Sequence, residues 1–219
     1  MVTKHIQASR HPPFVSKLEA RLRFSGISYT AGSDGPFKAP RGKIPFVALT
    51  KTDSTGQPLG ETTKLGDSRL IAEHLVNEGV AEDLNAQLSP AMRFQDLAVR
   101  GLLEERLYWL ECYERWIENF YDSRSMILQG IPYPAQVVVG LIVYRHMKSA
   151  MDGQGTTRFT PDEIRTFRLE IWQSFEGMLA ESMRNSSGDR PFWILGGDAP
   201  TEADATLFGF IASDLMCPS

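Results

Sequence analysis

Two short stretches decide the fold: Gly42-Lys43-Ile44-Pro45-Phe46 and, twenty residues later, Gly66-Asp67-Ser68. Residues 44–49 form an apolar run that predicts a strand, and a proline is tolerated at the first residue or the edge of a strand. An X–Pro bond can also be cis, which is uncommon and usually a specific feature of the fold. If the Ile44–Pro45 bond is cis, the amide and carbonyl of Ile44 turn outward and can pair with an extended peptide.

The second stretch precedes residues 69–75, which have the pattern of an amphipathic helix. The N–H groups and the positive dipole end of a helix start favour carboxylates. Lys43, the peptide edge at Ile44 and the helix start at Ser68 together predict a binding site for a small acidic peptide.

The remaining pattern divides the chain into a mixed half and a helical half. In the first half we expect strands at 2–6, 27–31, 44–49 and 62–65, and a helix from Phe14 to Gly26. Beyond residue 89 only helices are expected, at 90–120, at 134–151, from the capping-box sequence Thr160-Pro161-Asp162-Glu163, and from Thr201 to about 215.

These segments carry a family resemblance. "PPFVSKLEARLRFSGISY" (12–29), "APRGKIPFV" (39–47) and "GDSRLIAEHL" (66–75) resemble the thioredoxin-like N-terminal domain of glutathione transferases. "EERLYWLECYERW" (104–116) and "RPFWILGGDAPTEADATLFGFIASDL" (190–215) are similar to the helical domain of the failed-axon-connections and metaxin branch of that superfamily.

The resemblance implies an α/β plus all-α fold, with a thioredoxin-like glutathione-binding domain at 1–80 and a helical domain at 90–219. It implies that Lys43 pairs with the glycine carboxylate of glutathione and that Ile44 and Pro45 hold its cysteinyl part. Asp67 and Ser68 would recognise the γ-glutamyl end. The alternative for Lys43 is a solvated lysine in a loop, and the alternative for Asp67 and Ser68 is an ordinary helix N-cap. Capping and ligand binding can occur together, because a cap leaves the neighbouring N–H groups free.

One departure from the family pattern concerns thiol activation. Relatives often have Cys or Ser where this chain has Pro12, sometimes with a second Cys at the position of Val15. Neither residue present here can donate a hydrogen bond or form a mixed disulfide, so we expect no glutaredoxin-like reaction. The remaining candidates for lowering the pKa of a bound thiol are Ser9, Arg10, His11 and Ser16.

An aromatic series, Tyr108, Trp109, Tyr113 and Trp116, lies on the long helix expected at 90–120. The resemblance implies that this helix lines the pocket for a hydrophobic second substrate. The alternative is that these side chains fill the core of the helical domain. We expect Asp204 to be a helix N-cap residue and Cys112 to be a small buried side chain in the core.

The composition limits the remaining classes of function. A net charge of −4 with no basic cluster argues against a nucleic-acid partner. The first residues lack the apolar stretch of a signal peptide, and the longest apolar run is too short to cross a membrane. The histidines and cysteines have no metal-ligand spacing. We therefore expect a cytoplasmic protein without a metal, and the superfamily adds a homodimer as an expectation.

Two classes of function remain open. The first is a glutathione-dependent enzyme that adds the thiolate to an electrophilic carbon of a hydrophobic small molecule, as a transferase or, if the addition reverses, as a cis/trans isomerase. The second is a non-catalytic, metaxin-like interaction module. The intact peptide-binding pattern at 43–45 and 67–68 favours the enzyme.

Overall fold

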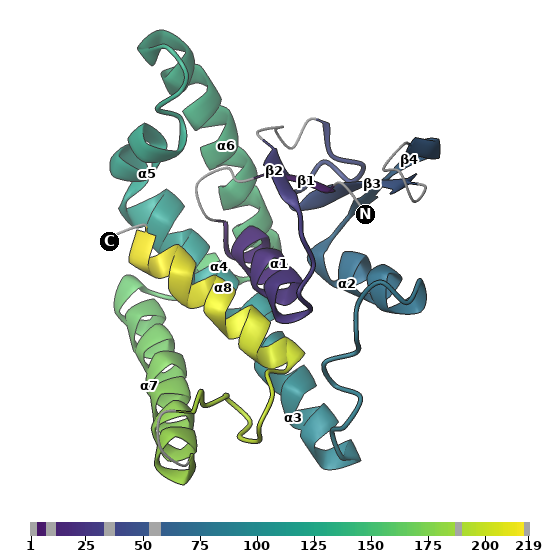
Figure 1. Cartoon of the computed structure of the whole chain (residues 1–219). Helices are drawn as coiled ribbons and strands as arrows, with labels where there is room; N and C mark the ends of the chain where they lie inside the picture. Colours follow the sequence, from purple (N-terminus) through teal and green to yellow (C-terminus); the bar gives the residue numbers. More distant parts are fainter. Residues whose placement is uncertain (1–3, 8–11, 33–37, 53–57, 187–189, 217–219) are drawn as a thin grey trace. The chain divides into compact units, whose positions relative to one another are not determined.

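The computed structural model describes residues 4–7, 12–32, 38–52, 58–186 and 190–216 (Figure 1). The chain divides into two compact units. The first contains Met1–Leu97 together with Gly197–Met216, and the second contains Ala98–Gly196. The boundary falls within helix α3 (Pro90–Gly101).

The first unit is built on a four-stranded sheet with the strand order β2-β1-β3-β4. Strand β1 (Lys4–Gln7) pairs in parallel with β2 (Thr30–Gly32), while β3 (Phe46–Thr52) is antiparallel to both β1 and β4 (Pro58–Gly66). The predicted order β-α-β, loop, β-β-α of a thioredoxin-like domain is confirmed. Strand β3 begins two residues later than expected, because Pro45 has no N–H for the ladder.

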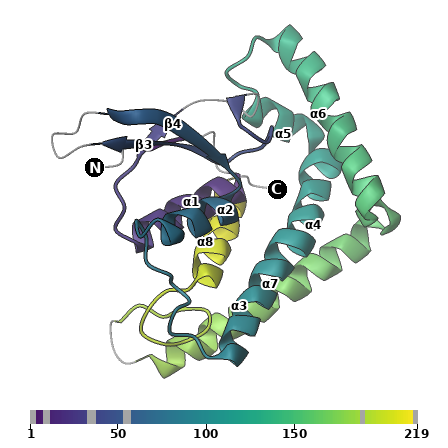
Figure 2. The same cartoon turned by 90° about the vertical axis from the view of Figure 1, so that its right-hand side faces the viewer.

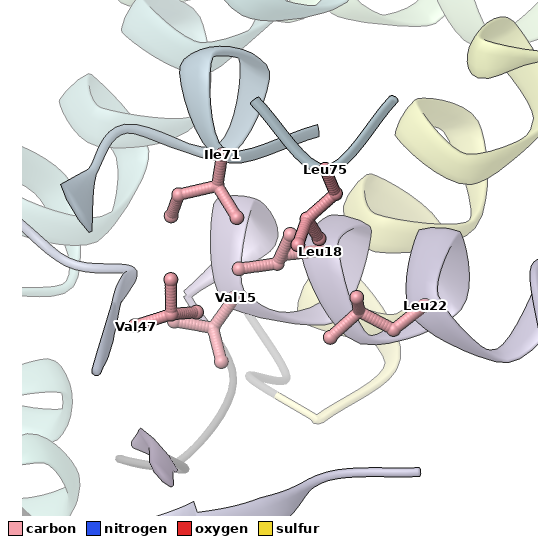
Figure 3. Packing of buried hydrophobic residues seen from close by; sticks show 6 residues of the cluster. All are labelled: Val15, Leu18, Leu22, Val47, Ile71 and Leu75. Atoms are coloured by element: carbon pink, nitrogen blue, oxygen red, sulfur yellow. The ribbon is translucent and has the colours of Figure 1, made fainter. Parts of the chain in front are cut away.

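Helices α1 (Pro13–Phe24) and α2 (Ser68–Asn77) share a hydrophobic core with β3. Figure 3 shows the six buried side chains of this core, which come from all three elements: Val15, Leu18, Leu22, Val47, Ile71 and Leu75. The apolar spacing that predicted these helices is therefore the spacing that faces the sheet.

Helix α8 (Glu202–Met216), the last of the chain, belongs to the first unit and packs along α1 (Figure 1). The contact is close at Gly209, where a Cβ atom would lie 2.4 Å from the carbonyl oxygen of Pro13 and 2.7 Å from the amide nitrogen of Lys17. At one end of the same contact, the buried guanidinium of Arg21 pairs with Glu202 and donates to the backbone carbonyl of Glu82. No side chain larger than hydrogen fits at position 209.

The start of α8 is completed by a local pair of polar residues and by a carboxylate from a distant part of the chain. The Asp204 carboxylate accepts from the amide and the hydroxyl of Thr201, at 2.8 and 2.7 Å. Buried Asp96 accepts from the amide of Ala203 at 2.7 Å. The N-terminal box predicted at Thr201 and Asp204 is confirmed.

The second unit is helical. After α3 come a π-helical segment (Leu102–Leu107), α4 (Tyr108–Tyr113), a second π-helical segment (Glu114–Glu118), α5 (Phe120–Ile127), α6 (Tyr133–Gln154), a 3₁₀ turn (Thr156–Arg158) and α7 (Pro161–Asn185). The helix expected at 90–120 contains these two π-helical segments and ends at Asn119, where φ is −109° and ψ is 37°. The predicted capping box of α7 is present, with Thr160 and Glu163 bonded to each other's backbone.

One buried cluster of this unit contains Cys112, Trp116 and Met151, with partly buried aromatic side chains packed around them. Helix α5 packs against α6, and α7 packs against α4 (Figure 2). No helix in the described part of the chain is long and apolar enough to cross a membrane.

Candidate functional site

A tight turn before β3 presents two cations. The amide of Gly42 donates to the carbonyl of Ala39 at 3.1 Å, and Pro40 occupies the second position of this turn, which its fixed φ favours. Gly42 has a φ of 64° and ends the turn. Arg41 and Lys43, on either side of this glycine, are exposed and form no ion pair with another described residue.

The turn leads directly to the Ile44–Pro45 bond, which is cis, as the sequence analysis considered. Pro45 is buried, and Ile44 packs its side chain against the core of the first unit. Ile44 lies outside the ladders of β3, and neither its amide nor its carbonyl bonds to another described residue. A free backbone edge for an extended peptide is therefore present here.

The two predicted stretches meet in space. The ladder between β3 and β4 ends with Phe46 opposite Gly66, and the amide of Asp67 then donates to the carbonyl of Pro45 at 3.2 Å. This bond places the start of α2 beside the free edge at Ile44. The juxtaposition expected from the sequence is thus formed within a single unit.

Asp67 combines a backbone constraint with a capping role. Its φ of 81° and ψ of 122° make it the one non-glycine residue with positive φ in the described ranges. Its carboxylate oxygen Oδ1 accepts from the amides of Arg69 and Leu70, at 3.0 and 3.1 Å. The expected N-cap role is present, and the second carboxylate oxygen, Oδ2, has no hydrogen bond to a described residue.

Capping by Asp67 leaves one pair of donors at the helix start. The amide of Ile71 bonds to the carbonyl of Asp67, and those of Arg69 and Leu70 bond to its side chain. The amide and the hydroxyl of Ser68 have no partner among the described residues, although Ser68 is only 6% exposed. Two adjacent donors at the positive end of a helix are a combination that suits a carboxylate.

Arg41 was missed by the sequence reasoning. Its side chain passes over Gly66, with Cγ 3.6 Å and Cδ 3.7 Å from the position that a Cβ atom on Gly66 would occupy. Its charge is therefore close to the start of α2. The only local signal was the turn sequence Pro40-Arg41-Gly42, which predicts the turn but not the strand over which the side chain lies.

The start of α1 offers few donors to a bound thiol. Pro12 and Pro13 occupy the N-cap and first helical positions and have no N–H, and the amides of Val15 and Ser16 both donate to the carbonyl of Pro12. Ser16 is buried in α1, and its hydroxyl has no partner among the described residues. The other three candidates, Ser9, Arg10 and His11, lie outside the described residues.

The aromatic series predicted to line a second pocket lies in the second unit. Trp116 is buried beside Cys112, and Tyr108, Trp109 and Tyr113 are partly buried around them. Burial raises the pKa of Cys112 from 9.0 to about 12, and Cys112 in turn raises the pKa of Tyr108. Cys112 is therefore a protonated, buried side chain at neutral pH and not a nucleophile.

The family profile described as "Glutathione S-transferase N-terminal domain" matches residues 13–122, half of the chain. This segment contains the cis-proline edge and the start of α2 described above. The protein belongs to the glutathione S-transferase superfamily, whose members use glutathione as a co-substrate. Its place in the failed-axon-connections and metaxin branch stays a prediction.

Three solved structures are similar to this chain. A glutathione S-transferase from Rhodospirillum rubrum F11 is 14% identical with a TM-score of 0.53, over 97% of this chain and 79% of that one. A maleylacetoacetate isomerase from Anaeromyxobacter dehalogenans 2CP-1 is 15% identical with a TM-score of 0.47, over 100% and 83% of the two chains. Glutathione transferase Omega 2S from Trametes versicolor is 14% identical with a TM-score of 0.40, over 96% and 70%. The Rhodospirillum structure supports the fold.

Proposed function

We propose that this protein is a glutathione-dependent enzyme that binds the tripeptide in its first unit and directs its thiol to an electrophilic carbon of a hydrophobic small molecule. One observation carries the proposal. The amide and hydroxyl of Ser68, which have no partner among the described residues, lie beside the backbone edge of Ile44, and the bond between Asp67 and Pro45 fixes both.

Each group of the site suits one part of glutathione. The amide and carbonyl of Ile44 pair with the cysteinyl backbone, next to Pro45. Ser68 donates to the γ-glutamyl α-carboxylate, and the free oxygen of Asp67 accepts from the neighbouring ammonium group. Lys43 faces the glycine carboxylate, as the sequence analysis expected, and the exposed Arg41, whose side chain passes over Gly66, adds a positive charge beside the start of α2, at the γ-glutamyl end.

Bound glutathione supplies a thiol, whose thiolate is the nucleophile. If the new C–S bond persists, the product is a conjugate. If that bond breaks again after rotation about a former double bond, the product is a geometric isomer and glutathione is released unchanged. Turnover of a polyene at constant total glutathione distinguishes isomerisation from conjugation.

Ionisation of the thiol requires groups that lower its pKa. A free thiol has a pKa of about 8.5, so only a few per cent is ionised at neutral pH. The prolines at the start of α1 remove donors that a helix terminus usually offers. Ser16, the described candidate, and Ser9, Arg10 and His11 remain the proposed activators.

The rival proposal is a non-catalytic binding module, which the replacement of a family Cys or Ser by Pro12 favours. Such a module need not bind glutathione. Calorimetric titration with glutathione at millimolar concentration separates the two classes, because the enzyme requires binding and an absence of heat at this concentration favours the module.

The same titration tests the individual residues. Ser68→Ala and Lys43→Ala should each weaken glutathione binding by about 1–3 kcal/mol, the range for hydrogen bonds to charged groups, with Lys43 at the lower end because it is exposed. Ser174→Ala and Lys148→Ala are matched controls on exposed faces of α7 and α6 and should leave the affinity unchanged. Unchanged affinity in both site variants would exclude the proposed site.

A further inference from the structure

Arg124, in the second unit, is a buried cation with no carboxylate partner among the residues that the structure describes. It is 8% exposed, and no described residue forms an ion pair with it. Its Nε atom is sealed from solvent and has no hydrogen-bond partner. The terminal nitrogens likewise donate no hydrogen bond to a described residue, but they keep contact with solvent.

Among the described residues, two other basic side chains are as deeply buried, and both have partners. Arg21 pairs with Glu202 and donates to a backbone carbonyl. Lys17, 3% exposed, also has an interaction partner. Buried charges in proteins are normally paired and hydrogen-bonded, because removing them from water is unfavourable. Arg124 therefore differs from the other buried cations in the described part of the chain, because it has no anionic partner there.

The surroundings of Arg124 are aromatic. Its guanidinium carbon lies 5.7 Å from the ring centre of Phe120, 5.6 Å from that of Tyr121 and 5.7 Å from that of Tyr133. These distances are within the range of cation–π attraction, which orients a guanidinium but leaves its N–H groups without acceptors. Phe120 and Tyr121 come from α5 and Tyr133 from the first turn of α6.

The packing of α5 on α6 makes room for this side chain. A Cβ atom on Gly140, in the middle of α6, would lie 2.6 Å from Cδ and 2.8 Å from Cγ of Arg124. Only a glycine lets the stem of Arg124 pass at this point. Tyr121 and Tyr133 are 73% and 67% exposed, so the aromatic surface beside the guanidinium continues to solvent.

We propose that Arg124 and its three aromatic neighbours form a binding site for the carboxylate of an aromatic acid. The terminal nitrogens of a guanidinium match a carboxylate in two parallel hydrogen bonds, and the acid would supply the missing negative charge. The tyrosine rings would contact the flat body of the ligand. Exposed apolar side chains of the same two helices are available to a larger ligand: Ile127, Val138, Leu141 and Ile142. Binding of the acid at this site does not require glutathione. Only the identification of this acid as the second substrate rests on the proposed function.

The experiment is a calorimetric titration without glutathione, using trans-cinnamate and its neutral counterpart trans-cinnamamide as probes. We expect cinnamate to bind about tenfold or more tightly than the amide, the margin typical of a charge-assisted pair. Arg124→Gln should remove this preference, and Arg145→Gln, an exposed arginine of α6, should retain it. Glutathione affinity should be unchanged in both variants, so a failure here is distinct from a failure of the site in the first unit.

Two further variants test the proposal in case Arg124→Gln does not fold. Tyr121→Ala alters an exposed side chain and should weaken cinnamate several-fold. Gly140→Ala retains every charge but collides with the stem of Arg124, so it should reduce the preference for cinnamate over the amide. The proposal would be overturned if cinnamate did not bind detectably or if the two probes bound with equal affinity. It would also be overturned if Arg124→Gln, or Gly140→Ala where Arg124→Gln does not fold, kept the preference for cinnamate unchanged.

Discussion

Asp67 allows the structural and ligand-binding roles of the start of α2 to be measured separately. The residue caps the helix through two hydrogen bonds, and it has a backbone conformation that residues other than glycine rarely adopt. Three substitutions change these features in different combinations. Asn retains the shape and the cap, Gly removes the cap but suits the backbone, and Ala removes the cap and retains the strain.

The expected stabilities follow from these features. Loss of an N-cap to alanine costs about 0.5–2 kcal/mol, whereas loss to glycine costs only a few tenths. Relief of an unfavourable positive φ by glycine is worth about 1 kcal/mol or more. Asp67→Ala should therefore be less stable than the wild type by about 1–2 kcal/mol, while Asp67→Gly and Asp67→Asn should lie within about 1 kcal/mol of it.

The binding of glutathione should rank the same variants differently. All three remove the negative charge that faces the γ-glutamyl ammonium group, so all three should bind glutathione more weakly. Since Asp67 is exposed, the loss should be about 1 kcal/mol, or roughly fivefold. Urea unfolding followed by circular dichroism gives the stabilities, and calorimetry gives the affinities.

Two results would refute this reasoning. If Asp67→Gly unfolds more readily than Asp67→Ala, the backbone at this residue is not strained in the way described. If Asp67→Asn binds glutathione as tightly as the wild type, the carboxylate acts only as a helix cap, and the proposed contact with the ammonium group is wrong.

Two more predictions concern the cores of the two units. Gly209→Ala should destabilise the first unit by about 2 kcal/mol or more in urea unfolding, because its methyl group would overlap the backbone at Pro13. Gly177→Ala is the control: this glycine lies on α7 with open space around it, so its replacement should be neutral or stabilising by up to about 1 kcal/mol. Equal effects of the two substitutions would contradict the packing argument. Because burial raises the pKa of Cys112 from 9.0 to about 12, the folded state holds its proton more tightly than the unfolded state, so stability is retained below pH 9 and falls between pH 9 and 12. Cys112→Ala should unfold with a shallower loss over this range, and identical pH profiles of variant and wild type would argue against the burial.

Local signals in the sequence were sufficient for most of the fold. The apolar spacing of α1 and α2, the capping box at Thr160 and the paired Thr201 and Asp204 each depend on residues within one or two turns of each other. The break at Asn119 lies at the expected end of the helix at 90–120, but the π-helical segments at 102–107 and 114–118 were missed. Helix periodicity identifies which face is buried but does not register a change of the hydrogen-bonding step.

The candidate site was predictable only in part. The residues at 43–45 and 67–68 were identified from two local motifs, and the bond between Asp67 and Pro45 joins them as expected. The position of Arg41 over Gly66 depends on how a turn meets a strand twenty-five residues later. Patterns of helix and strand periodicity relate only residues that are close in sequence, so they could not predict this contact. The close approach of α8 to α1 at Gly209 is likewise a contact between distant segments.

The most informative groups in both units share one physical property. Exposed cations such as Lys43 need no partner, because water solvates them, so their lack of ion pairs alone indicates little. Ser68 and Arg124 are only 6% and 8% exposed, and neither the donors of Ser68 nor the guanidinium of Arg124 has an acceptor among the described residues. A protein interior normally satisfies such groups. An anionic ligand would satisfy them at both places, and for this reason the variants of Ser68 and Arg124 test the two proposals more directly than variants of any exposed cation.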